Sequence, residues 1–275
     1  MSSQPASYGA CLGSRFPGGV LTSFRNAYIE KQVEALRDRP EVVALWEAGS
    51  AATGTTDEYS DIDLVALCSC ETNDAFELIE SAMPPIAHRY VEPEGHGVRH
   101  RIYFHDGAPK HFFADIGVLQ EDSRDTLNEL MVIERHGEPI VFFDDKGLIK
   151  PHPLNKIEWQ TKLEARVKEL EAAFPIYIVQ VLKALDRNQN TEAFAFFYHG
   201  LLRRLVELMG IRFRPYRYDF ELRYLERDFP QKEQESIHKY TNYVDPDNLR
   251  KNVRLVDQDI RENLAAIKRD GICLA

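Results

Sequence analysis

Long apolar runs are missing from this sequence of 275 residues. It has no stretch of about 18 apolar residues, which a membrane-spanning helix needs. It also has no apolar segment near its N-terminus of the kind that directs secretion. Internal repeats and low-complexity tracts are absent as well. We therefore expect a folded protein that neither crosses a membrane nor is exported.

Cysteine is scarce, with only Cys11, Cys68, Cys70 and Cys273. Their spacing matches no zinc-binding pattern. Cys68 and Cys70 lie at the end of an apolar run, where small thiols are typically buried. A reduced, cytoplasmic setting is therefore expected.

Basic residues are outnumbered, since 34 Lys and Arg stand against 44 Asp and Glu and give a formal charge of −10. A long nucleic-acid interface needs a basic face that displaces counterions, so nucleic acid is not an expected partner. An acidic surface instead suits a small cationic substrate, through long-range attraction. The 44% hydrophobic and 11% aromatic contents are those of a globular protein.

Two apolar segments and the loop between them form the most informative stretch. A short strand is expected over Glu41–Ala48, followed by a turn at Gly49-Ser50 and a second strand that holds Asp61 and Asp63. Alternation along that strand places both carboxylates on one face. Neighbouring carboxylates repel unless a cation lies between them, and Mg²⁺ binds carboxylates together with substrate phosphates. Backbone N–H groups at the turn suit an anion such as a triphosphate.

The combination Gly49-Ser50-x10-Asp61-x-Asp63 resembles the signature of the polymerase-β-like nucleotidyltransferases. Asp-x-Asp alone is a weak signal, because most such triplets are solvated acids; the Gly-Ser turn ahead of it makes the pattern specific. Ser60 gives the Ser-Asp-x-Asp form that is common in small bacterial members. The most similar group is the antibiotic (aminoglycoside or lincosamide) nucleotidyltransferases and their uncharacterised bacterial relatives.

This resemblance implies a Mg²⁺-dependent transfer of a nucleoside monophosphate, AMP if the donor is ATP, to a hydroxyl of a small molecule, with release of pyrophosphate. Antibiotic resistance is the most specific function it implies. Asp61 and Asp63 would bind the metal, while Gly49, Ser50 and Ser60 would bind the nucleotide. A third carboxylate is implied on a later strand.

Asp115 is the candidate for that third carboxylate. It lies within an expected strand, His111–Leu119, among apolar neighbours. A buried carboxylate without a partner is costly, so a cation or a metal should lie beside it. Asp115 would complete the metal site or accept the proton of the acceptor hydroxyl. The alternative is an acid at a strand edge that faces water.

The fold class expected is α+β, with a domain boundary at the proline-containing segment 149–154. After a flexible segment 1–20, residues 21–150 are expected to form a mixed-sheet catalytic domain with flanking helices. Residues 151–275 are expected to form an all-α helical bundle that binds the substrate, in a monomer or homodimer. Further strands are expected over Ile86–Val91, Arg99–His105 and within Glu134–Asp145. Helices are expected over Leu21–Leu36, Thr72–Met83, Trp159–Phe174, Ile176–Leu185, Thr191–Met209 with Gly210 as its C-cap, Asp219–Arg227, Glu233–Val244 and Pro246–Ile267.

Several roles stay open at the level of the sequence. The basic contact to the triphosphate has three candidates, Lys162, Lys183 and Arg204, and the alternative for each is an ordinary helix-surface charge. Glu134 and Glu207 are candidate bases or capping residues. An aromatic set either lines the acceptor site or forms helix core; it comprises Tyr216, Tyr218, Phe220 and Tyr224.

Three rival functions stay open too. The first is a nucleotidyltransferase that acts on a protein or RNA acceptor. The second is a catalytically inactive nucleotide-binding regulatory module. The third is an α/β interaction protein in which the motif is coincidental.

Overall fold

Two compact units make up the chain, residues 1–154 and residues 155–275. The computed structural model describes residues 20–93, 97–242 and 245–274. The expected flexible segment 1–20, apart from its last residue, lies outside these ranges, as do Cys11 and Val244. Within the described ranges, every helix is too short or too polar to cross a bilayer.

A six-stranded mixed sheet forms the first unit, in the order β3-β4-β5-β2-β1-β6. Its strands are β1 (Val42–Glu47), β2 (Ile62–Cys68), β3 (Ile86–Val91), β4 (Arg99–His105), β5 (Ala114–Gln120) and β6 (Ile140–Asp144). The central neighbours β2 and β5 run parallel, and the other paired strands are antiparallel. The two strands that carry the candidate carboxylates therefore lie side by side.

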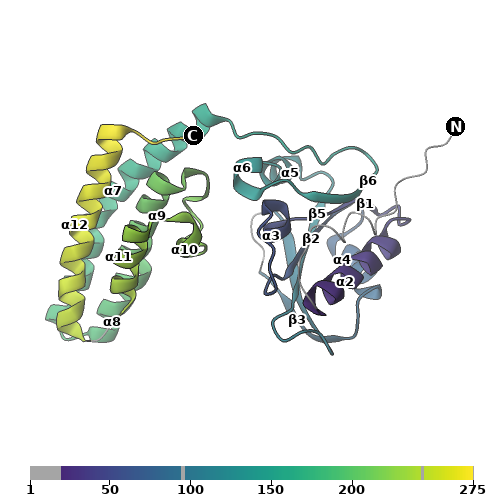
Figure 1. The fold of residues 1–275 in the computed structure, drawn as a ribbon, viewed down its shortest axis with the longest axis horizontal. Coiled ribbons are helices and arrows are strands. Elements are labelled where there is room, and N and C mark those ends of the chain that lie inside the picture. Colours follow the sequence, from purple (N-terminus) through teal and green to yellow (C-terminus); the bar gives the residue numbers. More distant parts are fainter. Residues whose placement is uncertain (1–19, 94–96, 243–244, 275) are drawn as a thin grey trace. The chain divides into compact units, whose positions relative to one another are not determined.

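Helices cover both faces of this sheet. On one face, α2 (Val20–Leu36) and α4 (Thr72–Ser81) lie next to each other (Figure 1) and share a core with Ile62 and Leu64 of β2. A second core on the other face includes Val65 and Leu67 of β2 and Leu127 of α5 (Arg124–Leu130). Because side chains alternate along β2, Asp63 belongs to the second face.

The regular secondary structure of the second unit is all helical within its described residues. Its long helices α7 (Lys156–Asp186), α9 (Arg203–Phe213) and α12 (Pro246–Asp270) pack against one another, and α11 (Gln231–Thr241) packs on α12 (Figure 1). Shorter elements are α8 (Asn190–Ala195), the π-helix η1 (Phe196–Leu202), the 3₁₀ turn η2 (Pro215–Arg217) and α10 (Leu225–Asp228). The prediction of an α+β fold, a mixed sheet with helices followed by a helical region, is confirmed.

The expected break between two helices at Pro175 is wrong. Pro175 lies inside the single helix α7. A proline removes one backbone hydrogen bond and usually kinks or ends a helix. Here buried residues on both sides of it, such as Phe174 and Val181, anchor the two halves of the helix in one core. Tertiary packing therefore outweighs the local preference.

Two further helix predictions in the second unit are wrong. The helix expected over Thr191–Met209 is divided into α8, η1 and α9, and Gly210 lies inside α9 instead of capping it. The helix expected over Asp219–Arg227 shrinks to the four residues of α10. Glycine is favoured at position 210 because this part of α9 lies close to the backbone of Tyr218. An added Cβ would lie 2.7 Å from the carbonyl oxygen of Tyr218.

Replacing Gly210 with alanine is expected to lower the free energy of unfolding by about 2 kcal/mol, because the new Cβ meets backbone that cannot move aside freely. In a helix with free space at this position, the same change would raise the free energy of unfolding by up to about 1 kcal/mol. A decrease therefore indicates that the new Cβ clashes with the backbone of Tyr218. Thermal unfolding of the variant measures it. Lys168→Ala, at an exposed position of α7, is the control and should stay within about 0.5 kcal/mol of the wild type.

Candidate active site

The two carboxylates of the Asp-x-Asp motif stand at the start of β2. Asp61 immediately precedes the strand and Asp63 is its second residue. Asp63 lies directly opposite Asp115 in the parallel pairing of β2 with β5. Neighbouring strands are about 4.8 Å apart, and side chains at paired positions point to the same face. The structure thus brings together the three carboxylates that the sequence predicted.

Gly49 opens the short helix α3 (Gly49–Thr53) directly beside Asp63. Its φ of +55° is a conformation that glycine adopts without strain. A Cβ added at Gly49 would overlap Oδ2 of Asp63, and the Ala48 amide donates to the Asp63 carbonyl at 2.8 Å. The motif therefore needs glycine for two reasons, the backbone angle and the space that the carboxylate fills. The first N–H groups of α3, like those of any helix, have no hydrogen-bond partner within their own helix. They belong to the end of α3 that lies beside this carboxylate.

Sequence reasoning missed a buried ion pair beneath the carboxylates. Arg25 of α2 contacts Glu47 at the end of β1, and these side chains are only 3% and 1% exposed. Nε of Arg25 also lies 3.4 Å from the carbonyl oxygen of Asp61. Glu47 stands near the end of an expected apolar strand, and nothing in the local sequence pairs it with a helix that precedes it. Only the folded structure shows that Arg25 connects α2 to the residue before β2.

Burial and mutual repulsion raise the pKa of the carboxylates at this site. Burial raises the pKa of Asp63 to about 6, and the charges of Asp61 and Asp115 add to the effect. Burial likewise raises the pKa of Asp61, with a further contribution from Asp115. The pKa of Glu47 rises to about 7 through burial, although the charge of Arg25 opposes the shift. The negative charges of these carboxylates repel one another, and a bound cation would reduce this repulsion.

His100 is a second residue that the sequence did not single out. Its Nδ1 lies 2.8 Å from Oδ1 of Asp115. The hydrogen bond to Asp115 raises the pKa of His100, so the imidazolium form is favoured beside that carboxylate. Asp115 is therefore neither an isolated buried acid nor an edge residue facing water.

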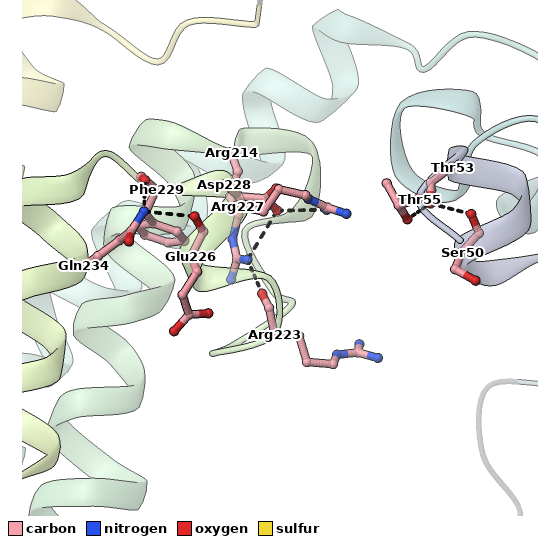
Figure 2. Close-up of polar contacts among 10 residues, drawn as sticks. All are labelled: Ser50, Thr53, Thr55, Arg214, Arg223, Glu226, Arg227, Asp228, Phe229 and Gln234. Carbon is pink, nitrogen blue, oxygen red and sulfur yellow. Dashed lines mark hydrogen bonds and ion pairs between the residues drawn. The ribbon is translucent and has the colours of Figure 1, made fainter. Parts of the chain in front are cut away.

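Serine and threonine hydroxyls surround the start of α3. The Ser50 hydroxyl lies 3.4 Å from that of Thr56, and the hydroxyls of Thr53 and Thr55 are 2.8 Å apart. Figure 2 shows Ser50, Thr53 and Thr55 together. Ser60 instead bonds within its own loop, accepting from the Asp57 amide at 2.9 Å. Ser50 thus follows Gly49 in α3 with its hydroxyl near Thr56, while Ser60 orders the loop before β2.

A divalent metal ion fits the chemistry of this donor set only in part. Across residues 20–93, 97–242 and 245–274, no three His, Cys, Asp or Glu side chains converge closely enough to hold a metal by themselves. Mg²⁺, however, commonly takes one or two carboxylates and completes its shell with substrate phosphates and water. Burial and then neighbouring negative charge raise the pKa values of Asp61 and Asp63, and this environment suits that mode of binding.

Some residues of the second unit whose roles the sequence left open interact with neighbouring residues of that unit. Lys162 lies over the Trp159 ring, 4.6 Å from its centroid. Glu207 is bound by Arg166, and Tyr218 is buried. Lys183 is exposed. In the first unit, Glu134 accepts a hydrogen bond from the Leu154 amide at 2.9 Å. The remaining aromatic residues Tyr216 and Phe220 are half-buried, and Tyr224 is exposed.

The stability of the metal-free protein is expected to depend on pH through Asp63. Its pKa in the folded state, about 6, exceeds the ordinary value of 3.8, so the folded state holds the proton more tightly. The resulting stabilisation is present below pH 4 and is lost as pH rises through about 6. Between pH 4.5 and 7.5 in chelator, we expect Tm to fall by on the order of 5 °C more in the wild type than in Asp63→Asn. Equal pH dependence of Tm in the two proteins would contradict this.

A family model matches the part of the chain that holds the Gly-Ser and Asp-x-Asp motif. The model of the nucleotidyltransferase domain family matches residues 29–105, which contain Gly49, Asp61 and Asp63. No match is found among curated proteins. Asp115 lies beyond the matched residues and is brought to the site by the sheet.

Several solved structures show a distant likeness. An aminoglycoside 6-adenyltransferase from Bacillus subtilis is 11% identical, with 88% of this chain and 89% of that chain covered and a TM-score of 0.36. A spectinomycin adenyltransferase from Enterococcus faecialis, solved with ATP and spectinomycin, is 12% identical over 86% and 99% of the chains, with a TM-score of 0.33. At such TM-scores this likeness carries no argument about substrates. By the family match and its motif, the chain carries a nucleotidyltransferase domain, and the prediction of a nucleotidyltransferase enzyme is confirmed at the level of that domain family.

Proposed function

We propose that the protein transfers a nucleoside monophosphate, AMP from ATP, to a hydroxyl of a small molecule and releases pyrophosphate. The observation that carries this proposal is the placement of Asp63 between Asp61, Asp115 and the glycine that opens α3. A carboxylate group with excess negative charge, next to unpaired backbone N–H groups, suits a metal-bound triphosphate.

In the reaction, an oxygen of the acceptor forms a bond to the α-phosphorus, and the bond from that phosphorus to the β-phosphate oxygen breaks. Bound Mg²⁺ would supply charge neutralisation of the phosphates. Asp61 and Asp63 would hold the metal, and Ser50 with the first amides of α3 would orient the phosphates. Asp115 accepts the proton of the acceptor hydroxyl, and the contact with His100 keeps the carboxylate oriented.

For the acceptor, we propose a small hydroxylated molecule. Aminoglycosides and lincosamides come first because the Gly-Ser and Asp-x-Asp motif resembles that of the enzymes that modify them. The net charge of −10 also favours an encounter with a cationic acceptor.

Pyrophosphate release tests this function. Each of the four NTPs is incubated with the protein and Mg²⁺, with and without a panel of aminoglycosides and lincosamides. Release that requires one NTP, Mg²⁺ and one acceptor, with a product heavier by one nucleoside monophosphate in mass spectrometry, is the expected result. Failure to bind any nucleotide in the presence of Mg²⁺ would overturn the proposal. Labelling of a protein or RNA acceptor instead would move the activity to a different acceptor class.

A further inference from the structure

A polar cavity of about 330 Å³ lies within the second unit. Its volume is at the lower end of the range found for small-molecule sites. Both signs of charge line it, among them Arg166, Arg203, Arg204, Glu207, Asp219 and Glu221. The arrangement of these charges indicates what the cavity can bind.

Two of the three arginines are already paired with carboxylates of the cavity. Nε and Nη2 of Arg166 lie 2.6 and 2.9 Å from the two oxygens of Glu207, and Arg203 is paired with Glu221. Arg204 differs, because within the described part of the chain no carboxylate lies at ion-pair distance from it. Its charge is the one that a bound anion would neutralise.

Arg204 is nevertheless held firmly in place. Its guanidinium lies over the Tyr177 ring, 3.9 Å from the centroid, and its Nη1 donates to the Gly200 carbonyl at 3.1 Å. An added Cβ at Gly200 would lie 2.8 Å from Cδ1 of Tyr177, so glycine lets the ring come under the arginine. Stacking fixes the plane of the guanidinium and leaves further N–H groups for a ligand.

The helix that carries these residues is itself unusual. η1, which includes His199 and Gly200, is a π-helix, and Arg203 and Arg204 follow it at the start of α9. π-Helical turns are rare and occur frequently at functional sites. Here the wider turn precedes two arginines that line one cavity, and His199 lines it as well.

The opposite wall is a loop organised by one buried arginine. Arg214, 7% exposed, donates to the main-chain carbonyl of Arg223 (Figure 2). It also donates to the main-chain carbonyl of Glu221. It also lies 3.6 Å from Asp228 and close enough to Asp219 for that carboxylate to affect its pKa. The loop that supplies Asp219 and Glu221 to the cavity therefore has a fixed conformation.

A second cavity of about 180 Å³ adjoins the first. The two share His199, Arg203 and Glu221, but the second is otherwise lined by apolar side chains, including Leu222 and Val206. The pair formed by Arg203 and Glu221 thus belongs to the wall between them. Its side chains are 57% and 53% exposed, so the pair is weak and can rearrange around a ligand.

We propose that this double cavity is a binding site for a small organic anion that carries an apolar group. Its oxyanion, a carboxylate or a phosphate monoester, binds Arg204, and its apolar group lies against Leu222 in the second cavity. A planar guanidinium binds both kinds of oxyanion through paired hydrogen bonds. The site lies within the second unit and does not depend on the proposed transfer reaction.

Isothermal titration of the full-length protein with benzoate, phenyl phosphate and acetate tests this site. Benzoate is expected to bind about tenfold more tightly than acetate, because its ring is removed from water. Comparison of benzoate with phenyl phosphate identifies the preferred oxyanion. Arg204→Ala should weaken the binding of both by at least about tenfold. Leu222→Ala should reduce the preference for benzoate over acetate to less than about threefold.

The matched control is Arg187→Ala, which removes an exposed arginine of the same unit that does not line the cavities. Equal loss of binding in Arg187→Ala and Arg204→Ala would overturn the proposal, as would no binding of either aromatic anion. The titration is repeated with saturating ATP and in Asp63→Asn. Unchanged benzoate binding in both supports a separate site, whereas displacement by ATP would make the cavity part of the nucleotide site and overturn it.

Discussion

Replacing Asp63 with asparagine is expected to lower the rate of nucleotide transfer on the order of 10³-fold. Asp63 is the carboxylate that the fold surrounds with other acids, since Asp61 precedes it at the start of β2 and Asp115 lies opposite it in β5. A neutral amide of the same shape binds a hard cation poorly and cannot replace its charge. The measurement is the rate of pyrophosphate release at saturating ATP, Mg²⁺ and acceptor.

The same substitution should leave the fold intact. Asp63→Asn removes a buried charge whose pKa is raised, so Tm at pH 7.5 without metal should be equal to or higher than that of the wild type. Asp106→Asn is the control, since Asp106 is an exposed carboxylate just after β4 and its loss should not change the rate. A variant of Asp63 that keeps more than a tenth of the wild-type rate would exclude it from the catalytic set.

Replacing Gly49 with alanine is expected to lower the rate on the order of 10²-fold. The added methyl group would overlap Oδ2 of Asp63, so either the carboxylate or the start of α3 has to move. A shift of about 1 Å in such a site is enough for a loss of this size. The rate is measured as for Asp63→Asn, and the metal dependence should shift to higher Mg²⁺ concentrations.

Gly54 offers a matched control for this experiment. It has a similar φ of +68°, but nothing lies within 4 Å of an added Cβ. Gly49→Ala and Gly54→Ala should therefore share the cost of a left-handed alanine, about 1–2 kcal/mol of stability. Only Gly49→Ala should lose transfer activity. Similar losses of activity in both would show that backbone strain, and not displacement of Asp63, is responsible.

The placement of the carboxylates in the first unit could be predicted from the sequence because its signals are local. The turn at Gly49 and the alternation of Asp61 and Asp63 along one strand depend only on neighbouring residues. Asp115 was identified by its apolar neighbours, and the parallel register then places it opposite Asp63. The partners Arg25 and His100 were not predictable, because a helix and a separate strand bring them to the site.

The second unit was less predictable because tertiary contacts override its local signals. Pro175 and Gly210 are residues that usually end helices, yet both lie inside helices whose buried faces hold them. The π-helix η1 has no recognised sequence pattern, so a single continuous helix was expected there. Arg204 was a candidate for contact with a triphosphate, but its stacking on Tyr177 and the cavity around it appear only in the fold.

The position of β5 in the sheet has a consequence for how the protein is made. β5 lies between β4 and β2 although it follows both in the chain, so it joins the β3–β4 hairpin to the strands that carry the motif. A nascent chain that ends before Ala114 contains Asp61 and Asp63 but lacks β5, and with it Asp115. Long-range pairing of this kind forms late in folding. The three carboxylates therefore come together only when β5 has paired with β2, and the proposed activity would report that this pairing has formed.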